Sequence, residues 1–354
     1  MKVRFLSMIL VALVIFAGCE KDDNITTPNA YTPTDSTWTD GAGGYNVRLN
    51  ATTVGHYRYY DLTNRQVVEI SDAASHSNGL WQVAFSRYLG KTNGGASGSA
   101  NMKAVDLAAV GLADSVNFEA IATAPAIADS LWHVDETTFA ISSDWYIYTG
   151  PPLHQILSAR KTYYVKSAAG KYAKMTIDTL RNSTMSSAGI ATVRFVYQAD
   201  GSTTFTESVH TVDLNATAGP AYLSFATGAA VVIADPLSSM AWDVMLDGYD
   251  IKLNGTIHGP GAAGALESEL SFELTTSVPA GAPFFQDNYL SVFGDASTNS
   301  WFSYGAQHEL GSKNHVYLLK TAGGTVFKMQ MKNYYLIVNG ASQSGWIQFR
   351  FKQL

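Results

Sequence analysis

Cysteine and charged residues are both scarce in this chain of 354 residues, and each scarcity excludes a class of protein. The single cysteine, Cys19, cannot form a disulfide within the chain or build a cysteine-clustered zinc or iron–sulfur site. Charged residues make up 15% of the sequence and the net charge is −6, which argues against nucleic-acid binding, because phosphate neutralisation needs an excess of Lys and Arg. Hydrophobic residues make up 46%, so the chain has ample material for a core.

Motifs that would identify an enzyme are also missing. No nucleophile elbow and no HExxH sequence occurs. One stretch, 259–264 (GPGAAG), fits the G-x-G-x-x-G phosphate-binding pattern, but that pattern requires a helix after the loop, and residues 266–274 have the character of a strand. We therefore interpret this stretch as a flexible loop and predict that the protein is not an enzyme.

The N-terminal segment has the organisation of a bacterial lipoprotein leader. Two positive charges precede an apolar run that is long enough for a signal peptide and too short for a membrane span. The run ends in Ala17-Gly18-Cys19, which resembles a lipobox. We expect a signal peptide at 1–18, lipidation of Cys19 and a flexible linker at 19–44. This predicts an outer membrane lipoprotein, exposed at the cell surface, that contacts the membrane through its lipid anchor only.

The rest of the chain contains a tandem repeat, because residues 47–52 (VRLNAT) recur as residues 212–217 (VDLNAT). Further residues match in the same order in the two copies: Tyr57 and Tyr222, Trp81 and Trp242, Tyr88 and Tyr249, Lys91 and Lys252, Asn93 and Asn254, Phe118 and Phe272, Trp145 and Trp301, Tyr148 and Tyr304, Lys174 and Lys328, Arg194 and Arg350. We therefore predict two homologous domains, 45–205 and 206–354, each able to fold by itself.

Hydrophobic residues in each copy mostly alternate with polar residues, as in β-strands. Residues 163–166 and 172–177 flank a glycine turn and predict a hairpin, with a counterpart at 316–320 and 326–331. Helical periodicity is weak, and the best candidate is a stretch of one or two turns at 118–124. The predicted fold is all-β, with two homologous antiparallel β-sheet domains in tandem after the signal peptide and tether.

Two long motifs carry a resemblance to a known family. Residues 81–95 (WQVAFSRYLGKTNGG) and 242–255 (WDVMLDGYDIKLNG) are similar to the central motif of HmuY-like lipoproteins, and the closing strands 164–197 and 316–351 resemble the end of that family. The resemblance implies an all-β surface lipoprotein. For the namesake it also implies capture of haem between two axial histidines, which suggests haem as a ligand and an outer-membrane haem transporter as a partner.

The histidines expected from the resemblance are not preserved, since Gly150 and Ala306 occupy the position of one family ligand and the segment that carries the other is shortened. His154 and His308 lie close to that position in matching loops, so they are the haem-ligand candidates; the alternative is that both are ordinary exposed loop histidines. The matched methionines Met175 and Met329 lie in alternating strands and are expected in the core. The remaining histidines have no counterpart in the other copy: His56, His76, His133, His210, His258 and His315.

Two functions therefore remain open from the sequence. The first is a ligand carrier that captures haem or a related planar ligand for iron acquisition. The second is a non-enzymatic interaction module, which binds a protein or a glycan through its loops and holds no haem.

Overall fold

The computed structural model describes residues 32–294 and 300–354. The expected signal peptide at 1–18 and the lipidation site Cys19 lie outside the described residues. Within the described part of the chain, no helix is both long and apolar enough to cross a membrane.

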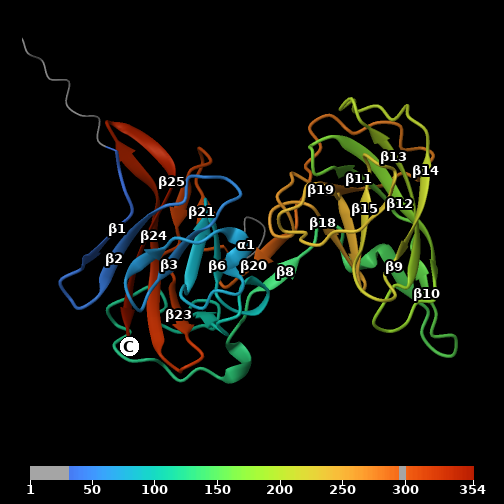
Figure 1. The fold of residues 1–354 in the computed structure, drawn as a ribbon. Coiled ribbons are helices and arrows are strands. Elements are labelled where there is room, and N and C mark those ends of the chain that lie inside the picture. Colours follow the sequence, from blue (N-terminus) through green and yellow to red (C-terminus); the bar gives the residue numbers. More distant parts are fainter. Residues whose placement is uncertain (1–31, 295–299) are drawn as a thin grey trace, which may run out of the picture.

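The described residues form two β-rich lobes that lie side by side (Figure 1). Each lobe packs one large antiparallel sheet against a smaller four-stranded sheet, and each carries one additional short hairpin. The predicted all-β, antiparallel fold is thereby confirmed.

The first lobe combines the two ends of the chain, blue and red in Figure 1. Its six-stranded sheet has the order β1 (Ser36–Thr39), β2 (Tyr45–Asn50), β25 (Ala341–Gln353), β24 (Val326–Val338), β23 (Val316–Lys320) and β7 (Lys103–Asp106). Its four-stranded sheet has the order β4 (Gln66–Val68), β3 (Arg58–Asp61), β5 (Val83–Ser86) and β6 (Leu89–Thr92). The remaining elements of this lobe are α1 (Asp72–Ser75), η1 (Gly95–Ser97), η2 (Asp129–Leu131), β21 (Phe302–Tyr304) and β22 (Leu310–Ser312).

The second lobe is built from the middle of the chain. Its five-stranded sheet has the order β14 (His210–Asn215), β13 (Ile190–Gln198), β12 (Tyr172–Arg181), β11 (Thr162–Lys166) and β19 (Gly264–Ser268). Its four-stranded sheet has the order β16 (Ala229–Val231), β15 (Ala221–Ser224), β17 (Val244–Asp247) and β18 (Asp250–Leu253). The remaining elements of this lobe are η3 (Ser143–Trp145), β9 (Tyr146–Tyr148) and β10 (Ile156–Ser158).

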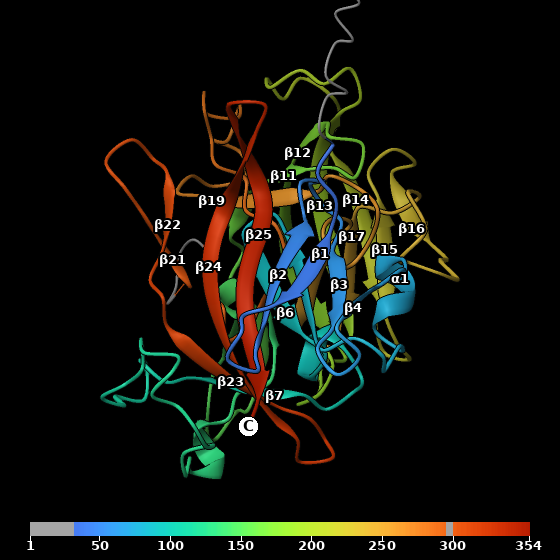
Figure 2. The ribbon, with the colours of Figure 1, turned by 90° about the vertical axis from the view of Figure 1, so that its left-hand side faces the viewer.

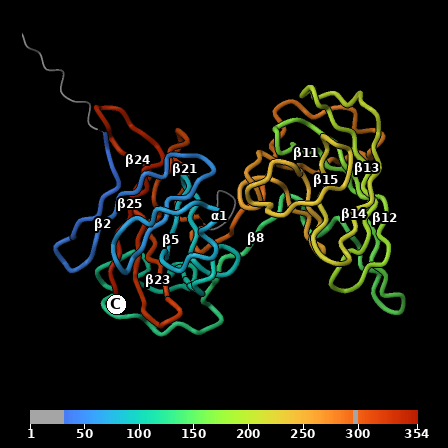
Figure 3. Tube along the Cα trace, in the orientation of Figure 1, coloured from blue at the N-terminus to red at the C-terminus, as the bar shows by residue number. Residues whose placement is uncertain are grey.

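The lobes do not coincide with the domains 45–205 and 206–354 expected from the repeat, because the two copies exchange their second halves. Strands β2 and β7 of the first copy pair with β25 and β23 of the second copy, and β11 and β13 of the first copy pair with β19 and β14 of the second. Figure 2 shows β2 beside β25, and Figure 3 shows the blue and red ends of the chain wound into one lobe.

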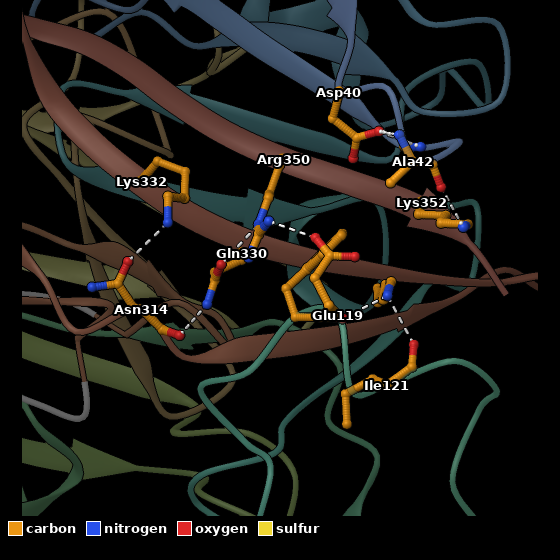
Figure 4. A network of polar contacts seen from close by, with 12 residues as sticks. Asp40, Ala42, Glu119, Ile121, Asn314, Gln330, Lys332, Arg350 and Lys352 are labelled. Carbon is orange, nitrogen blue, oxygen red and sulfur yellow. Dashed lines mark hydrogen bonds and ion pairs between the residues drawn. The ribbon is translucent and has the colours of Figure 1, made fainter.

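Side-chain contacts follow the same exchange. Arg350 binds Gln330 at 2.9 Å and Glu119 of the other copy at 2.8 Å (Figure 4), and its guanidinium lies 4.2 Å from the ring centroid of Phe118. The second lobe repeats this arrangement, since Arg194 contacts Glu273 at 2.8 Å and lies 4.4 Å from the ring of Phe272. Residues that match in sequence therefore occupy equivalent places, each with partners from the other copy.

The chain crosses between the lobes twice, at β8 (Glu136–Thr138) and β20 (Asn288–Leu290), and these two segments pair with each other. Asp135 binds the backbone of Thr92, and Asp287 binds the backbone of the matching Leu253, so Asp135 and Asp287 are equivalent. Two residues further on, the equivalent Thr137 and Tyr289 pair directly. A pseudo-twofold axis therefore passes through this pair, as in a domain-swapped dimer whose subunits are joined in one chain.

Apolar side chains that alternate along the strands form a separate core in each lobe. In the first lobe, Tyr60 and Phe85 of the small sheet pack on Phe349 of the large sheet, with ring centroids 5.6 and 5.8 Å apart. The predicted hairpins are present as β11–β12 and β23–β24. Met175 and Met329 are buried in the two cores, as expected.

Three local predictions need correction. Residues 36–39, expected in the linker 19–44, form edge strand β1, which is held where Asp35 pairs with Arg58 and Thr37 hydrogen-bonds Tyr60. Residues 118–124 form turns and no helix. The strand expected at 266–274 is β19, which begins at Gly264 and ends at Ser268; it does follow the glycine-rich loop in place of a helix.

Candidate functional site

Each lobe carries a short hairpin that begins after a buried tryptophan. Trp145 precedes β9 and donates its indole N–H to the carbonyl of Tyr249 at 2.9 Å, and Trp301 precedes β21 and donates to the carbonyl of Tyr88 at 2.8 Å. Both carbonyls belong to the other copy of the repeat. These hydrogen bonds fix the β9–β10 and β21–β22 hairpins in equivalent places on the two lobes.

The haem-ligand candidates His154 and His308 both lie in the loops of these hairpins and are exposed. Each has a left-handed backbone conformation, with φ of 49° and 61°, so the two loops turn in the same way. His154 Nδ1 hydrogen-bonds the hydroxyl of Tyr148, the last residue of β9. Each histidine lies two residues before the second strand of its hairpin, and their assignment as haem ligands stays a prediction.

The surroundings of the two histidines are partly apolar. Beside His154, the side chains of Ile147, Leu153 and Leu157 are exposed by 53%, 65% and 46%. His308 borders an open cavity of about 450 Å³ whose lining includes Leu310 and Tyr335. The two histidines belong to different lobes, so each site offers one histidine.

Three of the other histidines, His56, His258 and His315, have local side-chain partners. His56 binds Asp72 at 3.1 Å, and His315 binds Asp106 at 2.9 Å. His258 stacks on Phe139, and burial lowers the pKa of His258 to about 4. The residues that the structure describes contain no group of three His, Cys, Asp or Glu side chains that could hold a metal ion.

A second candidate site lies in the cleft between the lobes. Two adjoining cavities of about 310 and 710 Å³ share part of their walls, and their volumes are in the range of small-molecule sites. The first lobe contributes His56, Tyr57 and Lys91 to the smaller cavity, and the second lobe contributes Ile257 and Pro260. The cleft exists only because both lobes face each other.

Lys91 of β6 lies at the wall of the smaller cavity and is almost fully buried. Four aromatic rings form a cage around its ammonium group. The members of this Lys91 cage, with the distance from Nζ to each ring centroid, are Tyr57 (4.2 Å), Tyr289 (4.9 Å), Tyr59 (5.0 Å) and Trp81 (5.3 Å). Burial lowers the pKa of Lys91 to about 8, although the carboxylates of Asp72 and Asp135 act in the opposite direction.

The matching lysine of the other copy has different surroundings. Lys252 pairs with Asp247 at 2.7 Å, and the position equivalent to Asp247 in the first copy is Ser86. The sequence match paired Tyr222 with Tyr57. Strand register shows instead that Tyr222 corresponds to Tyr59. Thr137 takes the place of Tyr289. Only the first lobe therefore combines a complete cage with a lysine that has no adjacent carboxylate.

Only a weak signal for the Lys91 cage is present in the amino-acid sequence. Lys91 and Lys252 match between the copies, which suggests a shared packing role. The informative feature is a difference at one matched position, where the first copy has Ser86 and the second copy has Asp247. Lys91 therefore lacks the counterion that Lys252 has. Tyr289 comes from a crossing segment about 200 residues away, which no local pattern predicts.

The fold and the duplicated hairpins define a class, a two-lobed antiparallel β-protein made from two copies of one unit. The sequence profile of the family described as HmuY protein matches residues 53–197 and 217–351, which is most of the chain. The chain therefore belongs to the HmuY family and contains two tandem copies of the family unit. Among curated proteins, no relative matches it.

Three solved structures of bacterial proteins are similar to this chain. An HmuY-like candidate heme-binding protein from Bacteroides vulgatus ATCC 8482 is 10% identical, with a TM-score of 0.36, and the match covers 90% of this chain and 96% of that one. A candidate lipoprotein from Bacteroides fragilis NCTC 9343 is 12% identical, with a TM-score of 0.34 and coverage of 89% and 93%. An apo HmuY analog from Tannerella forsythia is 10% identical, with a TM-score of 0.32 and coverage of 91% and 98%.

Proposed function

We propose that this protein is a surface lipoprotein, anchored through Cys19, that captures haem or a related planar ligand and delivers it to an outer-membrane transporter for iron acquisition. Membership of the HmuY family supports this proposal. The observation that carries it is the equivalent presentation of His154 and His308 at the ends of two matching hairpins.

The β9–β10 hairpin has the chemistry that a haem face needs. When His154 Nδ1–H donates to the Tyr148 oxygen, the lone pair of Nε2 is free for iron, and the hydrogen bond orients the ring. The exposed Leu153, next to His154 in the loop, supplies an apolar surface, whereas Ile147 and Leu157 form a cross-strand pair on the hairpin face opposite to Tyr148. An exposed apolar macrocycle would be attracted to such a surface because contact removes both from water.

Haemin titration tests the proposal. We expect a shifted Soret band, with a stoichiometry of two when both hairpins bind. His154→Asn and His308→Asn are suitable replacements because asparagine tolerates the left-handed backbone at both positions. Each should remove about half of the shift and the double variant all of it, whereas His76→Asn, at an exposed histidine outside the hairpins, should leave it unchanged.

The alternative function is a non-enzymatic module that binds a protein or glycan. The exposed Ile147, Leu153 and Leu157 favour it, because clustered apolar side chains at a surface commonly mark interaction sites. The absence of any Soret shift in the wild-type protein would reject haem capture and leave this alternative. A shift that survives the double histidine variant would retain haem binding and reject His154 and His308 as ligands.

A further inference from the structure

The cleft between the lobes contains a buried cation that has no ion-pair partner among the described residues. Within the described residues, no carboxylate lies in ion-pair distance of the Lys91 ammonium, and no acceptor is hydrogen-bonded to it. A buried ammonium is costly unless an anion or hydrogen-bond acceptors compensate for its lost hydration. The aromatic rings of the Lys91 cage compensate in part through their negative faces, but they accept no strong hydrogen bond.

The nearby acids are already engaged by other donors. Asp72 accepts hydrogen bonds from the Tyr59 hydroxyl at 2.6 Å and from the Tyr57 amide at 3.1 Å, and its second oxygen binds His56. Asp135 accepts from the backbone and the hydroxyl of Thr92, both at 2.7 Å. The ammonium of Lys91 therefore remains the free hydrogen-bond donor at this cavity wall.

We propose that the cleft is a second ligand site, which takes a small aromatic carboxylate. The carboxylate binds the ammonium of Lys91, and the ring lies between Tyr57 and Tyr289 of the cage and Ile257 and Pro260 on the opposite lobe. A charge-assisted hydrogen bond in a partly desolvated site is among the stronger polar contacts available to a small ligand.

The apolar part of the ligand follows from the walls. Tyr57 and Tyr289, whose rings contact the Lys91 ammonium, line the cavity together with the aliphatic Ile257 and Pro260, and the polar part of the wall includes Asp72, which is hydrogen-bonded to Tyr59. A pocket that combines aromatic and aliphatic walls with a few polar groups is typical of small-molecule sites. The site does not include His154 or His308, so it is independent of the haem proposal and can fail without affecting it.

The probe for this site is 1-naphthaleneacetate, with the neutral 1-naphthaleneacetamide as the matched ligand control. We expect the acid to bind the wild-type protein at least about tenfold more tightly than the amide, as measured by tryptophan fluorescence and calorimetry. Lys91→Gln should abolish that preference. Lys252→Gln is the matched protein control, since Lys252 occupies the equivalent position and is paired with Asp247; it should leave the preference intact.

A second variant covers the case in which Lys91→Gln perturbs folding. Pro260 is exposed on the opposite wall, so Pro260→Glu changes the cleft without disturbing a core, and its added negative charge should weaken binding of the acid more than binding of the amide. Equal affinities for acid and amide, no binding of the acid at millimolar concentration, or equal effects of Lys91→Gln and Lys252→Gln would each overturn the proposal.

Discussion

Lys91 shows how a single residue can lower stability at a site suited to binding. Its side chain is surrounded by Tyr57, Tyr59, Trp81 and Tyr289, and removing the ammonium from water disfavours the charged form. Proteins commonly retain such destabilising groups where function requires them. The effect of this lysine on stability is therefore the balance between the desolvation of its charge and its attraction to the four rings.

Lys91→Met should stabilise the protein at pH 7. The pKa of Lys91 is about 8 in the folded protein, below the ordinary lysine value of 10.5. Between these two pH values the unfolded chain binds more protons than the folded protein. The contribution of Lys91 to stability therefore rises with pH across that window. The pKa difference limits the gain in the free energy of unfolding at pH 7 to about 3 kcal/mol. Because Lys91→Met also removes the attraction between the ammonium and the rings, the expected gain is about 1–2 kcal/mol.

Urea unfolding at about pH 7 and about pH 9.5 checks this expectation, and the gain should be smaller at the higher pH. Lys252→Met is the control, because it removes an ion pair with Asp247 and should not stabilise the protein at either pH. A Lys91→Met variant that is less stable than wild type at pH 7 would show that the aromatic contacts outweigh the desolvation of the ammonium.

At the scale of elements, the two hairpins depend on tryptophans that reach across the repeat. Trp145→Phe keeps most of the buried ring but removes the donor to the Tyr249 carbonyl, and Trp301→Phe does the same to the Tyr88 carbonyl. Loss of one hydrogen bond to a half-buried carbonyl costs about 0.5–1.5 kcal/mol, so each variant should lower the free energy of unfolding by that amount.

Chemical denaturation measures this loss, and the exposed Trp38→Phe provides a control that should change stability little. The two hairpin variants should have similar effects because their hydrogen bonds are equivalent. A loss at one tryptophan only would mean that the two lobes differ in how firmly they hold their hairpins.

The elements that were predictable from sequence are those whose pattern is local. Hairpins β11–β12 and β23–β24 follow from alternation around a glycine turn. Edge strand β1 was not predictable, because it is held by the distant Arg58 and Tyr60 and has little apolar content. The short helix expected at 118–124 fails because the carbonyls of Phe118 and Ile121 bind Lys328 of the other copy, so they are unavailable to helical amides.

For the candidate site, sequence identified the equivalence of His154 and His308 but not the cleft. The repeat shows that two hairpins have the same structure, which is a property of each copy alone. The Lys91 cage instead depends on Tyr289 from a crossing segment and on the approach of Ile257 from the other lobe. Contacts between the copies leave no periodic pattern in the sequence.

At the scale of the whole molecule, the exchange of halves could not be inferred from the repeat. Two homologous copies offer equivalent partners to every strand, so β7 has a suitable partner in either β11 or β23. The crossing segments β8 and β20 determine which is used, and they pair across the pseudo-twofold axis. This topology predicts which fragments of the chain can fold, and the answer differs from the boundaries of the sequence repeat.

Residues 139–287 should fold as an independent monomer, although this fragment cuts both copies of the repeat. It contains every strand of the five-stranded and four-stranded sheets of the second lobe together with the β9–β10 hairpin. It also retains Asp287, which binds the backbone of Ala140 and Leu253 and so closes the two ends of the fragment. Cooperative thermal unfolding and a monomeric mass in solution are the expected results.

Residues 45–205 form the matched comparison, because this fragment contains one whole copy of the repeat but neither lobe. It lacks β23 and β25, the partners of β7 and β2, and it lacks β19 and β14, the partners of β11 and β13. Since unpaired strand edges and half-exposed cores favour association, we expect an unfolded chain or an exchanged dimer and no folded monomer. A folded monomer of residues 45–205 would show that one copy can close on itself, whereas an unfolded 139–287 would show that the second lobe needs contacts with the first lobe to fold.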